Sequence, residues 1–165
     1  MRFNLSPRGS LDYITVDPGE SMRTLRGGCL CGAVEYEIPD ALLYAGYCYC
    51  SECRRFSGSP FSAFGGLSKA DFRLLKGAES IKHYAKNANT ILGFCSVCGS
   101  SLYAAKTQRE MINLRLGTLR DTPSLAPQAH AFVGSKVPWY KIGDDLIQFQ
   151  GAPTPSQWPS PSTRG

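Results

Sequence analysis

Seven cysteines carry most of the chemistry that this 165-residue sequence can perform. They form three short groups, namely Cys29 and Cys31, then Cys48, Cys50 and Cys53, and finally Cys95 and Cys98. Closely spaced thiolates are the preferred ligands of structural zinc, and thiolates also hold zinc in some catalytic sites. The spacing therefore predicts metal binding.

The first and last groups each supply two ligands. Cys95 and Cys98 have the spacing of a zinc knuckle, and Gly99 follows where the chain often needs a positive φ. Cys29 and Cys31 are two residues apart, so on a strand their side chains point to the same face. A structural zinc needs four ligands in a tetrahedron. The simplest arrangement joins both pairs in one closed structural site, which would tie distant strands together.

The middle group has three cysteines and no fourth. Three protein ligands with one vacant position are typical of a catalytic zinc. Cys48, Cys50 and Cys53 are therefore the predicted catalytic zinc ligands, and a fully loaded chain would hold two Zn²⁺ ions. His83 and His130 are possible fourth ligands, although a lone histidine more often packs in a core or lies on the surface.

Other arrangements of the cysteines stay open at this point. A disulfide framework would leave one of the seven thiols unpaired. A redox pair at Cys95 and Cys98 would be expected beside a βαβ pattern, which the sequence lacks. The middle group could also share ligands with one of the pairs, or both zinc sites could be structural.

Charge and hydropathy indicate which partners and which cellular compartment to expect. The net charge is +5, but the Lys and Arg residues are scattered, so no nucleic-acid partner is expected. No apolar run approaches the ~20 residues of a membrane helix, so no membrane partner is expected either. Residues 1–20 lack the apolar stretch of a signal peptide. We therefore expect a cytoplasmic protein, where cysteine clusters indicate metal sites before disulfides.

Alternating side chains indicate a mainly β fold. Val34, Tyr36 and Ile38 alternate with two glutamates, and Ile112, Leu114 and Leu116 alternate with Met111, Asn113 and Arg115. A short helix is expected just after Cys50. Further strands are expected near 61–66, 80–85, 90–95, 101–105 and 129–133, with turns at 65–66, 76–77 and 87–89.

The chain divides into three parts by composition. Residues 1–22 are polar, with glycines and prolines, and are expected to form an N-terminal extension. Residues 23–150 contain all the cysteines and form the predicted zinc-binding domain. Residues 151–165 are rich in proline and serine and are expected to be a mobile tail. Trp158 in that tail could dock on a partner surface, but a tail aromatic is more often incidental.

Three stretches of the chain resemble one protein family. They are GGCLCGAVEY at Cys29 and Cys31, CYCSECRR in the middle group, and FCSVCGSSLY at Cys95 and Cys98; Gly117-Thr118-Leu119, His130 and Pro138-Trp139 follow in the expected order. Over residues 23–150 the chain resembles the glutathione-dependent formaldehyde-activating enzymes, which share their domain with centromere protein V.

The resemblance implies an Mss4-like fold, in which zinc pins small antiparallel sheets. It implies the same division of the cysteines, and a carbon–sulfur lyase activity that joins glutathione and formaldehyde into S-hydroxymethylglutathione. Glutathione or a related thiol is thus the expected partner, and the oligomeric state is not predicted. Arg54 and Arg55 directly follow Cys53 and are candidate substrate-binding residues for a glutathione carboxylate, or they offset an anionic zinc.

The sequence departs from the family pattern at two positions. Tyr49 stands where members often have histidine, and Arg120 stands where an acidic residue is common. Either change could alter the charge of the pocket or a proton route. Two other functions therefore stay open, namely a zinc-thiol enzyme or thiol carrier for another substrate, and a binding module for tubulin or chromatin. The sequence shows no long basic arm that would favour the binding module.

Overall fold

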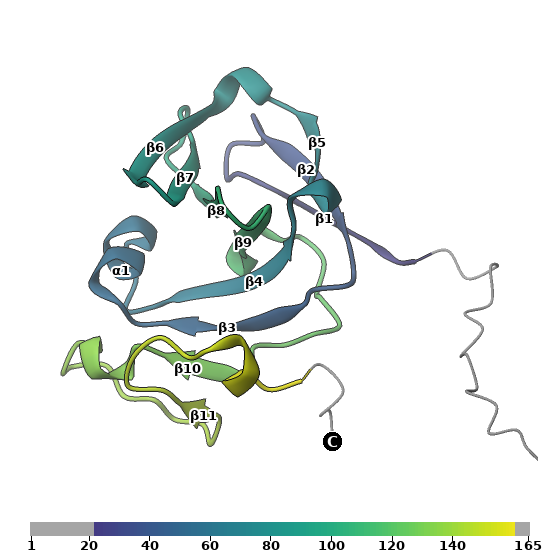
Figure 1. The fold of residues 1–165 in the computed structure, drawn as a ribbon. Coiled ribbons are helices and arrows are strands. Elements are labelled where there is room, and N and C mark those ends of the chain that lie inside the picture. The colour runs from purple at the N-terminus through teal and green to yellow at the C-terminus, as the bar shows by residue number, and fades with distance from the viewer. Residues whose placement is uncertain (1–21, 161–165) are drawn as a thin grey trace, which may run out of the picture.

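A computed structural model describes residues 22–160, and two β-sheets make up most of the described chain (Figure 1). The smaller sheet contains β1 (Thr24–Gly28), β2 (Glu35–Pro39) and β5 (Arg73–Lys76), paired antiparallel in the order β1-β2-β5. On β2, Tyr36 and Ile38 are buried while the two glutamates are partly exposed, as the alternation predicted.

The larger sheet has eight strands in the order β11-β10-β3-β4-β9-β8-β7-β6. β10 pairs in parallel with both β3 and β11, and the other neighbours are antiparallel. The mainly β class is therefore confirmed. The strands are β3 (Tyr44–Cys48), β4 (Ser62–Ser68), β6 (Ile81–Asn87), β7 (Thr90–Cys95), β8 (Ser101–Lys106), β9 (Met111–Arg115), β10 (Ala129–Ala131) and β11 (Ile147–Gln148).

Helical structure is short. The one α-helix of the described residues, α1 (Ser51–Ser57), lies between β3 and β4 in the chain and confirms the helix expected after Cys50. The remaining helical turns are 3-10 turns at Lys69–Asp71, Ala78–Ser80, Leu116–Thr118, Val133–Ser135 and Pro155–Gln157. No helix within residues 22–160 is long and apolar enough to cross a membrane.

The core forms where side chains of the two sheets meet. Its fully buried members include Leu25 and Tyr36 of the smaller sheet and Leu102 and Leu114 of the larger one. Burying each such side chain stabilises the fold by about 1.5–3 kcal/mol. Cys29 and Cys95 belong to this buried core, so the core is continuous with two of the four cysteines predicted to form the structural zinc site.

The turn expected at Gly65-Gly66 is wrong, because both glycines lie inside β4. The ring of Tyr44, on the neighbouring strand β3, occupies the space that a side chain at Gly66 would fill. The Tyr44 hydroxyl then donates to Asn113 Oδ1 on β9 at 2.8 Å. Glycine inside a strand here permits close packing across the sheet and not a chain reversal. The turns at 76–77 and 87–89 are present.

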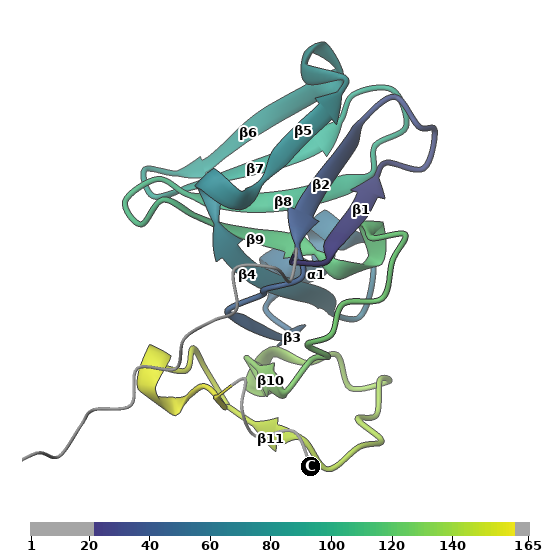
Figure 2. The same cartoon turned by 90° about the vertical axis from the view of Figure 1, so that its right-hand side faces the viewer.

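Part of the expected C-terminal tail is packed against the sheet. The Trp158 ring contacts Tyr44, Phe64 and Phe149, with centroid separations of 5.9, 5.7 and 6.2 Å. Figure 2 shows residues up to 160 beside β3 and β10. Trp158 therefore packs residues of the expected tail against β3 and β4, and the mobility expected from residue 151 stays a prediction. Residues 1–21 and 161–165, and most of the expected N-terminal extension with them, lie outside the described part.

Candidate metal centres

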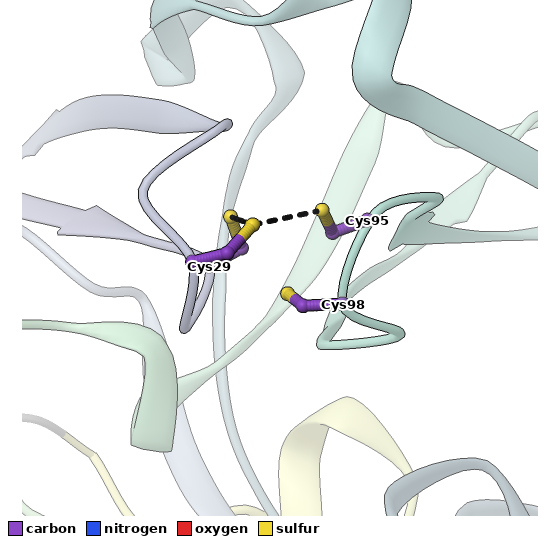
Figure 3. Close-up of side chains that lie close together, drawn as sticks. Cys29, Cys95 and Cys98 are labelled. Carbon is purple, nitrogen blue, oxygen red and sulfur yellow. Dashed lines mark hydrogen bonds between the residues drawn. The ribbon is translucent and has the colours of Figure 1, made fainter.

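The first candidate metal centre joins two distant turns. Cys29 and Cys31 lie in the β1–β2 turn, while Cys95 ends β7 and Cys98 lies in the β7–β8 turn (Figure 3). The Sγ atoms of Cys29 and Cys31 are 3.5 Å apart, those of Cys31 and Cys95 are 3.9 Å apart, and all four lie within 4.8 Å of one another. Tetrahedral zinc with Zn–S bonds of ~2.3 Å places its sulfurs ~3.8 Å apart. The four thiols therefore fit one closed zinc site, as the pairing of the two groups predicted.

Local backbone structure presents these thiols. Gly32 and Gly99 have φ values of +75°, which lets the chain turn directly after each cysteine pair. The Val34 N–H donates to Cys29 Sγ at 3.2 Å, and hydrogen bonds from Ser100 lower the pKa of Cys98 to about 5. Hydrogen bonds to sulfur favour the thiolate that binds metal. These bonds favour the thiolate of Cys98, whereas hydrogen bonds shared with the other thiols raise the pKa of Cys31.

The second candidate centre comprises Cys48 at the end of β3, Cys50 at the N-cap of α1, and Cys53 in the first turn of α1. Their sulfurs lie within 4.8 Å of one another. The Cys53 N–H donates to Cys50 Sγ at 3.3 Å. Hydrogen bonds from the thiols of Cys48 and Cys53 lower the pKa of Cys50, while the pKa of Cys48 is raised by the same shared bonds and by burial. Cys50 is thus both the N-cap of α1 and a member of the thiol cluster.

Within residues 22–160 no histidine, aspartate or glutamate joins either group. His83 Nε2 lies 2.8 Å from the Tyr103 hydroxyl. His130 is buried, with Nδ1 2.9 Å from the Tyr49 hydroxyl and Nε2 2.7 Å from Asp144 Oδ1. Neither histidine therefore lies where it could be a fourth ligand, and the middle group presents three thiols.

The three-thiol group faces a large cavity. The cavity has a volume of about 920 Å³, and Cys48, Cys50 and Cys53 form part of its wall. Four basic side chains line the same cavity, namely Lys86, Lys106, Arg109 and Arg115. Lys86 also forms an ion pair with Glu52, which links α1 to β6 beside the thiols. A ligand on the thiol side would therefore meet a positively charged wall.

Arg115 is the most buried of these cations, with 6% of its surface exposed. Its guanidinium donates to Ser62 Oγ at 2.9 Å and to Ser101 Oγ at 3.3 Å, and it lies 5.3 Å from the centre of the Phe56 ring. Burial lowers the pKa of Arg115. The negative charges of Cys53 and Cys48 counteract part of this lowering. A guanidinium stays protonated in such a site. Arg115 therefore supplies a fixed positive charge beside three thiols.

Sequence reasoning missed Arg115 because it read one face of β9 as solvated. Met111, Asn113 and Arg115 alternate with buried residues, and that pattern usually marks a surface. Here all three line the cavity. The one sequence feature that could have indicated its buried position is that Arg115 ends a strand, while serines, Ser62 and Ser101, occur in the neighbouring strands.

The family model of the glutathione-dependent formaldehyde-activating enzyme matches residues 24–135. The chain belongs to this family. A Halomonas elongata protein provisionally named as such an enzyme is 28% identical over 126 residues, which cover 72% of this chain and 80% of that protein.

This family member is also similar to a second named protein and to a solved structure. A Schizosaccharomyces pombe protein named an uncharacterised lyase is 31% identical over 86 residues, covering 52% of this chain and 61% of that protein. The crystal structure of a Rhodobacter sphaeroides protein aligns with a TM-score of 0.50 and 27% identity, covering 60% of this chain and 91% of that chain. The resemblance found in the cysteine motifs is thus confirmed.

Arg54 and Arg55 of this formaldehyde-activating enzyme family member do not line the large cavity. Arg54 Nε donates to the Tyr49 carbonyl at 3.1 Å, and Arg55 Nε donates to the Ser51 carbonyl at 3.2 Å. Both border a separate, smaller groove beside Trp139. Their predicted role in substrate binding stays a prediction, but their position favours a role in holding the loop and helix around Cys50.

The two departures from the family pattern also have defined positions. The Tyr49 hydroxyl bonds to His130, so a chain of hydrogen bonds runs from the buried Tyr49 and His130 to the exposed Asp144. The hydrogen bond from His130 lowers the pKa of Asp144. Arg120 pairs with Glu35 of β2 at 3.4 Å and lies outside the cavity lining. Neither residue therefore changes the charge of the cavity wall.

Proposed function

We propose that this chain is a zinc-thiolate enzyme of the carbon–sulfur lyase type that binds glutathione and condenses it with formaldehyde to S-hydroxymethylglutathione. The observation that carries the proposal is the three-thiol cluster opening into a basic cavity. Family membership and the lyase name of one relative support the reaction class. The reaction needs reduced cysteines, which agrees with the expected cytoplasmic location.

Cys48, Cys50 and Cys53 would hold the catalytic zinc. When bound, that ion supplies a coordination position at which an added thiol stays deprotonated at neutral pH. Three thiolates and Zn²⁺ carry a net charge of about −1. Arg115 offsets this charge from within the wall, so a further anionic sulfur can approach. Cys29, Cys31, Cys95 and Cys98 would hold a second, structural zinc.

The other cations suit the carboxylates of glutathione. Lys86, Lys106 and Arg109 line the cavity on β6, on β8 and in the β8–β9 turn. Lys106 Nζ donates to Thr90 Oγ1 at 3.1 Å, which holds it at the wall. Charge-assisted contacts of this kind orient a ligand as well as bind it. They would place the glutathione sulfur at the thiol cluster and hold it for attack.

The chemical step is an addition. The glutathione sulfur forms a bond to the carbonyl carbon, the C=O π bond breaks, and the proton that left the thiol ends on the new hydroxyl oxygen. Atoms balance without an oxidant or a reductant. The chain contributes a thiolate at neutral pH and the proximity of both reactants.

Calorimetry on the zinc-loaded protein tests the proposal. Glutathione should bind, and S-methylglutathione should bind more weakly because its sulfur has no proton to lose. Lys106→Gln should weaken glutathione binding, whereas the exposed Lys69→Gln, outside the cavity, should not. Equal affinity for the two ligands would mean that the sulfur does not meet the metal. Faster loss of formaldehyde in the presence of glutathione is the catalytic test.

A further inference from the structure

A second wall of the cavity is apolar and comes from the end of the described chain. Ala152, Pro153, Pro155, Trp158 and Pro159 line it from the C-terminal segment, and Leu43 and Phe64 line it from the β3–β4 side. Figure 2 shows this segment on the same side of the molecule as the β6–β7 and β8–β9 turns. The cavity is therefore amphipathic, with thiols and cations on some elements and an apolar wall on others.

The C-terminal wall is built into the fold. The Trp158 ring occupies the space beside Gly46, where an added Cβ would lie 2.5 Å from the indole. Gln128 Nε2 donates to the Ser160 carbonyl at 3.0 Å. Thr154 and Gln157 form a reciprocal capping box around the turn Pro155–Gln157. The Phe132 N–H donates to the Gly151 carbonyl at 3.1 Å, so hydrogen bonds hold the segment at both ends, and the family match ends before it, at residue 135.

Neither formaldehyde nor glutathione has a large apolar group that would contact this wall. Glutathione is a polar tripeptide with two carboxylates and one amine, and formaldehyde contributes a single carbon. The volume of about 920 Å³ lies at the upper end of the ~300–1,000 Å³ range of small-molecule pockets. Tryptophan, phenylalanine, leucine and proline side chains lining one side of a pocket select for apolar ligand surface.

We propose that this enzyme accepts, besides formaldehyde, an aldehyde that carries an apolar group of several carbons, and that the C-terminal segment receives that group. The inference rests on the proposed function, since the same glutathione sulfur is the nucleophile. Sulfur forms a bond to the aldehyde carbon, the carbonyl π bond breaks, and the thiol proton ends on oxygen, giving a hemithioacetal. The glutathione part lies against the cations and the organic group lies against Trp158.

S-alkyl glutathiones are stable probes of this geometry. Titration of the zinc-loaded full chain with S-methylglutathione, S-hexylglutathione and S-benzylglutathione compares apolar groups on one polar frame. Each methylene that leaves water adds roughly threefold to fourfold in affinity. We therefore expect S-hexylglutathione to bind at least ~10-fold more tightly than S-methylglutathione. Equal affinities across the three probes would overturn the inference.

The two tryptophans of the chain provide a second readout. Trp139 is 71% exposed and lies outside the cavity, so Trp139→Phe leaves Trp158 as the sole tryptophan. In that variant, S-hexylglutathione should shift the fluorescence of Trp158 more than S-methylglutathione does. An unchanged spectrum at saturation would show that the alkyl group does not reach the wall.

Substitutions then separate the wall from the rest of the site. Trp158→Ala should remove most of the hexyl preference, whereas Trp139→Ala should retain it. If Trp158→Ala does not fold, Leu43→Gln serves, because Leu43 is 52% exposed and its loss from the core is small. A hexyl preference that survives both Trp158→Ala and Leu43→Gln would overturn the inference.

The outcomes also distinguish this inference from the proposed function. If glutathione binds but the hexyl group adds nothing, the glutathione site stands and the apolar specificity falls. If S-hexylglutathione binds tightly and free glutathione does not, the zinc-thiolate proposal falls, and with it the hemithioacetal substrate. A final comparison of hexanal with formaldehyde should show a lower KM for hexanal in the glutathione-dependent reaction.

Discussion

Arg115 shows how a residue outside the ligand set can belong to a candidate metal centre. It is buried beside Cys48 and Cys53, and two serine hydroxyls hold its guanidinium. The seven cysteines were identifiable from sequence because their spacing alone indicates metal binding. Arg115 was not, because nothing in its local sequence shows that its face of β9 borders a cavity.

Arg115→Met should weaken zinc binding at the three-cysteine cluster by roughly 10- to 100-fold, the usual effect of removing a partner outside the ligand set. Arg115→Lys should lose less, because it keeps the charge. Chelator competition on each variant measures the affinity. Arg73→Met is the matched control, since Arg73 is exposed on the smaller sheet and pairs with Glu37. Unchanged zinc affinity in Arg115→Met would assign the arginine to packing alone.

The Tyr49 hydroxyl permits a second test at the residue scale. Tyr49→Phe leaves His130 Nδ1 buried without its partner, which should cost about 1–3 kcal/mol of unfolding free energy. Denaturant unfolding measures the loss, and the exposed Tyr84→Phe is the control. Zinc content should not change, because Tyr49 is not a ligand. A loss below about 0.5 kcal/mol would show that the hydrogen bond contributes little.

At the scale of elements, the two cysteine clusters connect different parts of the chain. We call the group of Cys29, Cys31, Cys95 and Cys98 the closed cluster and the group of Cys48, Cys50 and Cys53 the open cluster. The closed cluster connects the β1–β2 turn to the β7–β8 turn, joining residues 64 positions apart in two different sheets. The open cluster connects only the end of β3 to the first turn of α1. Metal loss should therefore unfold the chain in the first case and affect only the cavity wall in the second.

Cys98→Ser or Cys29→Ser should give insoluble or largely unfolded protein. Structural zinc contributes about 10–16 kcal/mol in small domains, which exceeds the net stability of ~5–15 kcal/mol of an ordinary domain. Cys50→Ser should fold cooperatively, because serine is also a good N-cap for α1. It should lose one zinc and glutathione binding. Thermal melting with zinc analysis compares the three variants, and equal collapse of Cys50→Ser and Cys98→Ser would make the middle cluster structural.

Some elements were predictable and others were not, for reasons visible in their packing. β2 alternates buried and half-buried residues, and β9 does so as far as Leu114, so the periodicity of their apolar residues identified both strands. β3 has buried neighbours at Ala45 and Gly46 and shows no alternation, because other elements cover both of its faces. The C-terminal segment has a loop-like composition, and only the tertiary contacts of Trp158 keep it in place.

For the whole molecule, the number of zinc ions per chain tests both metal assignments at once. Protein purified without chelator should contain between one and two zinc ions per chain, because the open cluster has three ligands and an accessible edge. Mild chelation should remove the open-site zinc first and leave the fold intact. Elemental analysis with circular dichroism follows both quantities. A zinc content near zero in well-folded protein would contradict both metal assignments.

The parallel pairing of β10 with β3 also affects how the chain can be made. Tyr49 directly follows the paired residues Tyr47 and Cys48, and it lies 81 residues before its hydrogen-bond partner His130. A ribosome adding about 5–20 residues per second needs several seconds to supply the second after the first. During that interval one edge of β3 has no strand beside it, and the thiol of Cys48 at its end is not yet enclosed. Oxidation of Cys48 and pairing of the free strand edge with another nascent chain are thus hazards specific to this interval of synthesis.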